Sequence, residues 1–196
     1  MSKTTKNVER FLNSFGKEVV KKAKSNLKNA GKGGGKLENS IESKVVKVGD
    51  GFVIQWSMAD YGTFQDKGVK GKGGSIPTGK YKGKHGGRRH YITWQGKRKD
   101  SPYKFGSGRG KKGGLRKGIA SFVRKKGLQP RSKGGKYMTP KGLIYLISRS
   151  IYIRGIHGVS FFQNSLMLGM KTFQSRYGAA IKQDIADNLR GKKKKK

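Results

Sequence analysis

The chain contains no cysteine among its 196 residues. This absence excludes disulfide bonds, thiolate zinc sites and cysteine nucleophiles, and it fits assembly in a reducing cytoplasm. No apolar run approaches the roughly 20 residues that cross a bilayer. Residues 1–15 also lack the apolar core of a signal peptide. We therefore expect no membrane partner.

Acidic residues are scarce as well. Only 10 Asp and Glu oppose 47 Lys and Arg, which gives a formal net charge of +37. A folded body with this charge repels itself, so we expect polyanions or acidic protein surfaces to neutralise it. Nucleic acid is one such partner, because Lys and Arg release counterions from phosphates whatever the base sequence.

The same scarcity argues against catalysis. A nuclease, the enzyme class that best suits the charge, needs carboxylates clustered around Mg²⁺, and no Asp or Glu lies between Ser101 and Gln183. The three histidines show no pairing with carboxylates at metal-ligand spacing. We expect Asp184 and Asp187 on the exposed face of a helix. The sequence therefore predicts a protein that is not an enzyme, with no catalytic residue, no metal site and no cofactor.

The N-terminal third has regular patterning. Apolar residues at spacings of three and four predict an amphipathic helix over residues 5–29. Two strands are expected at about 43–48 and 52–58, because the turn Gly49-Asp50-Gly51 between them is typical of a hairpin. The second strand alternates apolar and polar residues, and its apolar face is the expected dock for the helix.

The composition changes at Lys67. Residues 67–135 hold 22 Lys and Arg, 18 Gly and one acidic residue, Asp100. Such a segment has little apolar area to offset its ordering entropy. We therefore predict an insertion that is mobile alone and ordered by partners, with one short helix near Leu115–Val123.

Aromatic residues are interleaved with the cations of this insertion. They could stack on bases while the cations bind phosphates, or the segment could pack between subunits or against an acidic neighbour; both interpretations stay open. The candidate interaction residues are Arg88, Arg89, Trp94, Lys97, Arg98, Lys99, Arg109, Lys111, Lys112, Arg124, Lys125 and Lys126.

The C-terminal third again has helical patterning. Thr139-Pro140 is a typical helix start, and we expect about three turns of helix and then a strand over 151–159. Ser160 and Gln163 have the spacing of a capping box ahead of a long helix over 161–189. Phe161, Met167 and Leu168 lie off the main apolar stripe of that helix. Either a neighbouring subunit or the helix at 139–150 is expected to cover them.

These elements predict an α+β fold, in which a long N-terminal and a long C-terminal helix pack a small antiparallel sheet. The expected core is divided between residues 1–66 (helix and hairpin) and 139–190 (helix, strand and long helix). Residues 67–138 form a large basic, Gly-rich insertion arm, and residues 191–196 form a solvated lysine tail.

Three short motifs resemble those of the tail-completion, or head–tail joining, proteins of tailed bacteriophages. The first is similar to the family's Gly-x-Leu-x-x-Ser-Ile, the second to Tyr-Ala-x-Tyr/Phe-x-Glu-x-Gly-Thr, and the third to Pro-Phe-Leu-Arg-Pro-Ala-Leu. Their matching residues here are Leu37, Ser40 and Ile41, then Tyr61, Phe64, Asp66 and Gly68, then Phe161, Phe162 and Leu166. The chain departs from the family where Asp66 replaces Glu, Val69 replaces Thr, and Ser160 and Asn164 replace proline.

The resemblance implies a structural virion protein, a minor tail component that forms a ring in the phage neck between portal and tail. Its partners would be copies of itself, portal or adaptor proteins, and tail proteins, after assembly in the host cytoplasm. The basic arm would reach acidic surfaces or packaged double-stranded DNA. The alternative is a basic nucleic-acid-binding protein, either ribosome-associated or DNA-condensing.

Overall fold

The computed structural model describes residues 5–76, 82–87, 89–105, 114–129, 135 and 138–193, without the side chains of His85 and 191–193. The fold is α+β, as predicted. The chain forms two units. The first contains residues 1–66, 92–98 and 159–196, and the second contains 67–91 and 99–158. The two ends of the chain therefore share one unit.

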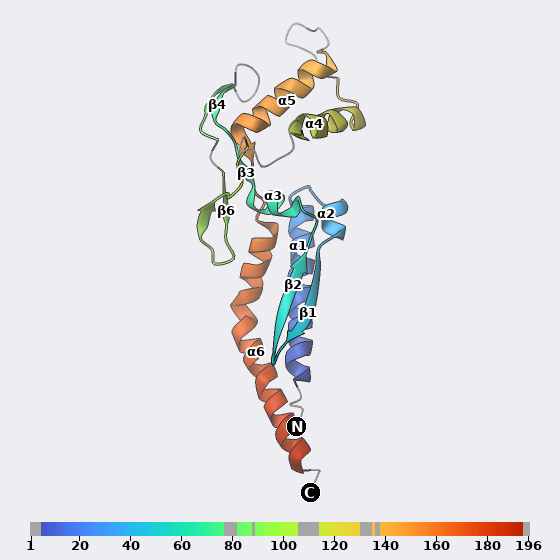
Figure 1. The fold of residues 1–196 in the computed structure, drawn as a ribbon, viewed down its shortest axis with the longest axis vertical. Helices are drawn as coiled ribbons and strands as arrows, with labels where there is room; N and C mark the ends of the chain where they lie inside the picture. Colours follow the sequence, from blue (N-terminus) through green and yellow to red (C-terminus); the bar gives the residue numbers. More distant parts are fainter. Residues whose placement is uncertain are drawn as a thin grey trace. The chain divides into compact units, whose positions relative to one another are not determined.

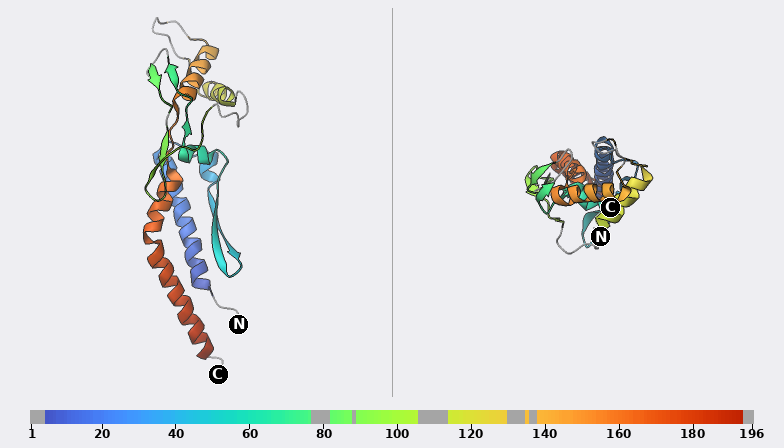
Figure 2. Two further views of the ribbon diagram at one scale, coloured as in Figure 1. Left: turned by 60° about the vertical axis from the view of Figure 1, so that its left-hand side comes forward. Right: turned by 90° about the horizontal axis from the view of Figure 1, so that it is seen from above.

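The first unit is built on two long antiparallel helices, α1 (Lys6–Asn29) and α6 (Phe161–Lys193), which lie side by side (Figure 1). An antiparallel hairpin of β1 (Glu42–Val48) and β2 (Gly51–Ser57) packs on α1 (Figure 2). Both predicted helices and the predicted hairpin are confirmed, although α6 continues past Gly191. Two short helices, α2 (Lys36–Asn39) and α3 (Gly62–Lys67), flank the hairpin in the chain.

Aromatic rings fill the contact between α1 and α6. Phe15 meets Phe173 edge-on with ring centroids 4.9 Å apart, and Phe173 stacks on Tyr177 at 5.5 Å. Gly169 makes the close approach possible, because a Cβ there would lie 2.9 Å from Cε2 of Phe15. Each buried apolar side chain of this size stabilises the fold by about 1.5–3 kcal/mol. The pairing of chain ends thus rests on apolar burial.

A carboxylate from α6 caps the start of α1. The backbone N–H groups of Asn7 and Val8 donate to Oδ1 and Oδ2 of Asp184, each at 3.0 Å, whereas Thr5 makes no side-chain cap. The first amides of a helix lack partners and attract negative charge. Asp184 is only 4% exposed, so the expectation that it lies on an exposed helix face was wrong.

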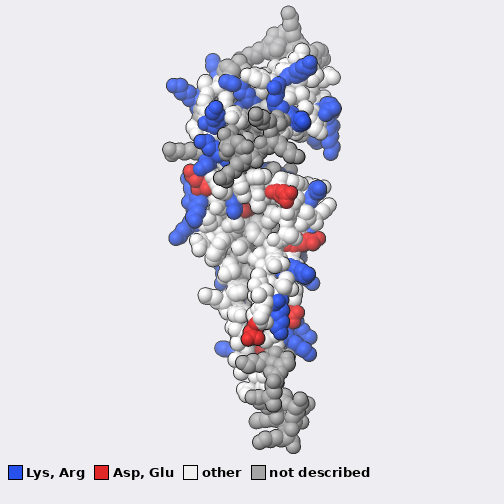
Figure 3. Space-filling view, in the orientation of Figure 1, with Lys and Arg blue, Asp and Glu red and all other residues white. Residues whose placement is uncertain are grey.

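The second unit contains two helices, α4 (Gly114–Lys125) and α5 (Pro140–Arg154), which pack together. The short helix in the basic segment is confirmed, and so is the helix start at Thr139, whose Oγ1 accepts from the N–H of Gly142 at 3.2 Å. The helix after Thr139 belongs to this unit, not to the core of the first as expected. Lys and Arg side chains gather over α4 and α5 (Figure 3).

Three short strand pairs lie within residues 67–158. The expected strand over 151–159 was wrong, because α5 continues to Arg154 and only two residues after it are extended. A short apolar run such as 151–153 fits a helix and a strand equally well, and Gly155, at φ +81°, ends the helix. The pairs are β3 (Val69–Lys70) with β8 (Gly155–Ile156), β4 (Gly74–Ile76) with β5 (Gly83–His85), and β6 (His90–Ile92) with β7 (Arg98–Asp100).

Much of the described part of 67–138 is therefore folded into helix and strand. Whether it orders without partners stays a prediction. No helix among the described residues is long and apolar enough to span a membrane.

Two glycines of α6 test the packing of the helix pair. Gly169→Ala should lower the free energy of unfolding by about 1–3 kcal/mol, because the new methyl group meets the buried ring of Phe15. Gly178→Ala should raise it by up to about 1 kcal/mol, because a Cβ there meets nothing within 4 Å and alanine favours helix. Urea denaturation measures both. Equal effects of the two substitutions would contradict the packing described.

Candidate functional site: the motif junction at the start of α6

The start of α6 is held by Asp66, from the second phage-like motif. Its Oδ1 accepts the backbone N–H of Phe162 at 2.8 Å and that of Gln163 at 3.4 Å. The backbone N–H of Ser160 donates to the carbonyl of Asp66 at 2.9 Å. Asp66 is 3% exposed. The second and third motifs, almost 100 residues apart in sequence, therefore meet through a buried, charge-assisted cap.

The predicted capping box at Ser160 and Gln163 was wrong. Ser160 adopts φ +51°, and its Oγ accepts the N–H of Ile92 at 3.1 Å. Oε1 of Gln163 accepts the N–H of Trp94 at 3.0 Å. These two side chains hold residues 92–98, the turn between β6 and β7, against α6. A carboxylate from elsewhere in the chain takes the capping role, since an ionised acceptor binds N–H groups more strongly than a hydroxyl does.

The first motif joins the same junction. Leu37 and Ile41 form a buried cluster with Phe161 of the third motif, together with Ala23 and Leu27 of α1. Phe161 and Ile41 are fully buried. Ser40 fixes the chain around this cluster, because its Oγ accepts the N–H of Ala59 at 2.9 Å and donates to the carbonyl of Leu37 at 2.8 Å. All three motifs therefore converge in the first unit.

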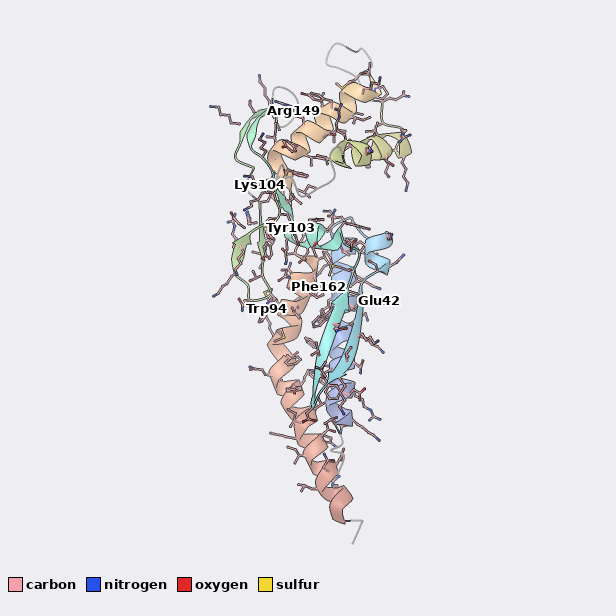
Figure 4. All side chains as sticks on the ribbon, in the orientation of Figure 1. Glu42, Trp94, Tyr103, Lys104, Arg149 and Phe162 are labelled. Atoms are coloured by element: carbon pink, nitrogen blue, oxygen red, sulfur yellow. The ribbon has the colours of Figure 1, made fainter. Side chains whose placement is uncertain are left out.

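The remaining motif residues have different environments. Phe162 packs edge-on against Trp56 of β2 at 5.8 Å (Figure 4), and Leu166 is half-buried. Tyr61 and Phe64 are 42% and 41% exposed. Gly68 belongs to the second unit, at φ +72°, and a Cβ there would collide with the backbone of residues 156 and 158. The motif residues thus range from fully buried (Ile41, Phe161) through partly buried (Phe162, Leu166) to an exposed aromatic pair (Tyr61, Phe64).

Polar side chains reinforce the junction from α1. Nδ2 of Asn26 donates to the carbonyl of Phe161 at 3.2 Å and to Oγ of Ser165 at 3.0 Å. Oγ of Ser165, fully buried, donates to the same carbonyl at 2.7 Å. Sequence reasoning missed both residues: Asn26 lies in no recognisable motif, and Ser165 lies within the third motif but at a position where the family has alanine. Their polar character on otherwise apolar helix faces is the signal that could have found them.

Glu38 holds the Gly-rich loop before the first motif (residues 31–36) in place through two contacts. Its Oε2 accepts the backbone N–H of Gly34 at 2.6 Å, and its Oε1 lies 3.2 Å from Nζ of Lys28. The Gly34 hydrogen bond, assisted by Lys28, lowers the pKa of the Glu38 carboxyl below its ordinary value. The loop is thus anchored to α1 by a carboxylate that favours the ionised state.

The off-stripe residues of α6 have three different environments, and cover by a neighbouring subunit stays a prediction. The β6–β7 turn lies against Met167, since a Cβ on Gly96 would be 3.8 Å from the Met167 sulfur. Phe161 is in the core cluster, and Leu168 stays 44% exposed. Sequence analysis missed this turn as a cover because its residues lie within the basic segment.

The described candidate interaction residues are divided between the two units: Trp94, Lys97 and Arg98 belong to the first, and Arg89, Lys99, Arg124, Lys125 and Lys126 to the second. Arg89 is half-buried, and burial together with the nearby Arg154 lowers its pKa. Trp94, Lys97, Arg98 and Lys99 are exposed around the β6–β7 turn, whereas Arg124, Lys125 and Lys126 are exposed at the end of α4. Arg88, Arg109, Lys111, Lys112 and the side chains of the lysine tail lie outside the described residues.

Within the described part of the chain, no group of three or more His, Asp or Glu side chains could hold a metal ion. Comparisons with protein-family models, with curated proteins and with solved structures find no match to this chain. The hydrogen bonds of Asp66 join the end of the N-terminal segment to the start of α6, two segments that are distant in the sequence.

Substitution of Asp66 tests how much these hydrogen bonds contribute to stability. Asp66→Ala should lower the free energy of unfolding by about 1–3 kcal/mol, because the N–H groups of Phe162 and Gln163 lose their acceptor. Asp66→Asn should cost less, since the amide oxygen can still accept. Asp60→Asn, at an exposed position, is the matched control and should stay within about 0.5 kcal/mol. Chemical denaturation is the measurement, and an equal loss in the Asp66 and Asp60 variants would refute the cap.

Lowering the pH below 4.5 should reduce the free energy of unfolding of the first unit. A bidentate Glu18–Arg176 pair, with both contacts at 2.8 Å, lowers the pKa of Glu18, as the Gly34 contact does for Glu38, from an ordinary value of 4.5. Both carboxylates therefore bind fewer protons when folded than when unfolded. Their stabilisation is present above pH 4.5 and is lost as the pH falls through the lowered folded values.

Denaturation at pH 7, 5, 4 and 3 measures this dependence. Glu18→Gln combined with Glu38→Gln should flatten the loss of stability below pH 4.5. Glu42→Gln, at an exposed position, should follow the unmodified protein within about 0.5 kcal/mol. An unchanged acid dependence in the double variant would show that these two contacts do not supply it.

Proposed function

We propose that this chain is a structural virion protein of a tailed bacteriophage, a tail-completion or head–tail connector protein that forms a ring in the neck. The observation that carries the proposal is the convergence of all three phage-like motifs around Asp66 and Phe161. Here they close one helix-and-hairpin unit from segments far apart in the chain.

The first unit also offers surfaces for self-association. Ile185, about half exposed, lines a groove together with Phe52 of the hairpin, Tyr177 and Ile181. Val48, Val53 and Leu189 are about half exposed as well. Exposed apolar groups that gather in one region are typical of protein contacts. A head-to-tail contact that closes on itself gives a ring from one kind of chain.

Within the proposal, the protein works by shape. A ring would join portal or adaptor proteins to tail proteins, and the exposed Tyr61 and Phe64 would lie among the residues offered to neighbours. No chemical step is required of the chain. The second candidate function is binding of nucleic acid as the chain's whole role, and the charge of the second unit favours it.

Negative-stain electron microscopy of the purified protein tests the connector proposal. We expect closed rings at micromolar concentration and co-purification of the chain with virions. Ile185→Asp combined with Leu189→Asp should reduce the rings to monomers that keep their helical circular dichroism, because burial of a charge opposes an apolar contact. Gln183→Asp, on the same helix at an exposed polar position, should leave the rings intact. Monomers at high concentration together with absence from every particle would contradict the proposal.

A further inference from the structure

The second unit concentrates positive charge. Residues 67–91 and 99–158 contain 24 Lys and Arg and one acidic residue, Asp100. Asp100 lies 3.8 Å from Nζ of Lys70, so part of its charge is already offset inside the unit. Helices α4 and α5 contain no Asp or Glu, and blue side chains project over both (Figure 3). A partner of this surface must supply many negative charges in a small area.

Helix α4 divides its residues between an apolar and a basic face. Val123 is buried and Ile119 is half-buried on one face, whereas Lys117 and Lys125 are exposed on the other. At 1.5 Å per residue, the two lysines are separated by about 12 Å along the helix axis. Arg124 lies beside the second lysine and is also exposed. The basic face thus carries cations at its two ends.

The middle of this basic face carries only small side chains. Gly118 and Ser121 lie between the cations and are exposed, and a Cβ on Gly118 would meet nothing within 4 Å. A ligand can therefore approach the helix backbone between the two cationic ends. The glycine is not demanded by packing within the unit.

Duplex DNA matches this arrangement better than a single strand does. Its two phosphate rows flank a major groove about 12 Å wide, close to the separation of the cationic ends of α4. Single-strand binding uses successive exposed rings on which bases stack. In this unit Phe105 packs on Tyr152 at 5.9 Å and Lys67 lies over Tyr91 at 5.8 Å, whereas Phe122 of α4 and Tyr145 of α5 are about half exposed. Each helix thus offers one exposed ring and not a succession of them.

We propose that the second unit binds the phosphate backbone of double-stranded DNA through α4, with Lys117 at one phosphate row and Arg124 and Lys125 at the other. Binding is independent of base sequence, because only phosphates are contacted. The proposal rests on the connector function only where it names packaged DNA as the natural duplex. Sequence analysis identified the cations at the end of α4 but missed Lys117, whose seven-residue spacing from Arg124 is the signal for a shared helix face.

Fluorescence anisotropy with 30-base-pair duplexes of two unrelated sequences, at 50–200 mM salt, tests the proposal on the full chain. The test variant combines Lys117→Gln, Arg124→Gln and Lys125→Gln. The control combines Lys47→Gln, Lys171→Gln and Lys182→Gln, which remove the same charge from exposed positions of the first unit. Lys117→Arg combined with Lys125→Arg should bind as the unmodified chain does, and circular dichroism confirms that each variant is folded.

The expected result is equal affinity for both duplexes, with the test variant weakened about tenfold or more at 100 mM salt. Its dependence of log affinity on log salt should be shallower by roughly 0.9 per lost contact, hence by up to about 2.7. The control should keep the original slope. Equal weakening of both triple variants, tighter binding of single-stranded DNA, or binding of polyglutamate but not of DNA would each overturn the proposal.

Failure here and failure of the connector function are separable. Rings in the microscope with no duplex binding would overturn the α4 proposal and leave the connector intact. Duplex binding through α4 by a chain that never forms rings or enters a particle would support the α4 proposal and overturn the connector function.

Discussion

The structure depends on the antiparallel contact between α1 and α6. Each helix begins at a carboxylate that the other end of the unit supplies: Asp184 of α6 caps α1, and Asp66, at the end of the N-terminal segment, caps α6. Because both caps are buried carboxylate groups that accept backbone N–H groups at helix starts, these hydrogen bonds form only in the native alignment of the helices. The rings of Phe15 and Phe173 add the apolar burial that holds this alignment.

This contact explains how the chain tolerates a basic middle. The helix pair and the hairpin bury their apolar faces together, and of the basic middle only residues 92–98 belong to the same unit. The second unit forms its own contacts between α4 and α5 and between short strand pairs. Glycines serve these close approaches, since a side chain on Gly71 would collide with the backbone of residues 153 and 154. High glycine content and dense charge thus coexist with folded structure.

Periodic segments were predictable from the sequence, whereas long-range polar contacts were not. The helix over 5–29, the hairpin at Gly49 and the start at Thr139 follow from local patterns and turn chemistry. Asp66 and Asp184 each cap an amide more than 90 positions away in the sequence, so no local pattern predicts these caps. Ser160 and Gln163 have the right spacing for a local cap, but Asp66 accepts the N–H groups at the start of α6 instead. The side chains of Ser160 and Gln163 accept N–H groups of Ile92 and Trp94.

The same distinction applies to the candidate site. The three motifs identified residues that do meet, but their roles became clear only in space: Phe161 in the core, Asp66 as a cap, Tyr61 and Phe64 exposed. Among the cations, sequence position alone could not separate half-buried Arg89 from the exposed end of α4. Burial depends on which elements pack together, and that depends on the whole chain.

Native-state hydrogen exchange measures most directly whether the chain ends fold as one unit. The account predicts that amides in the middle of α1 and of α6 exchange with the same opening free energy and the same denaturant dependence, because neither helix persists without the other. It also predicts that the N–H groups of Val8 and Phe162 are protected, although each lies in the first turn of its helix. Independent exchange of the two helices, or unprotected amides at these two positions, would contradict the account.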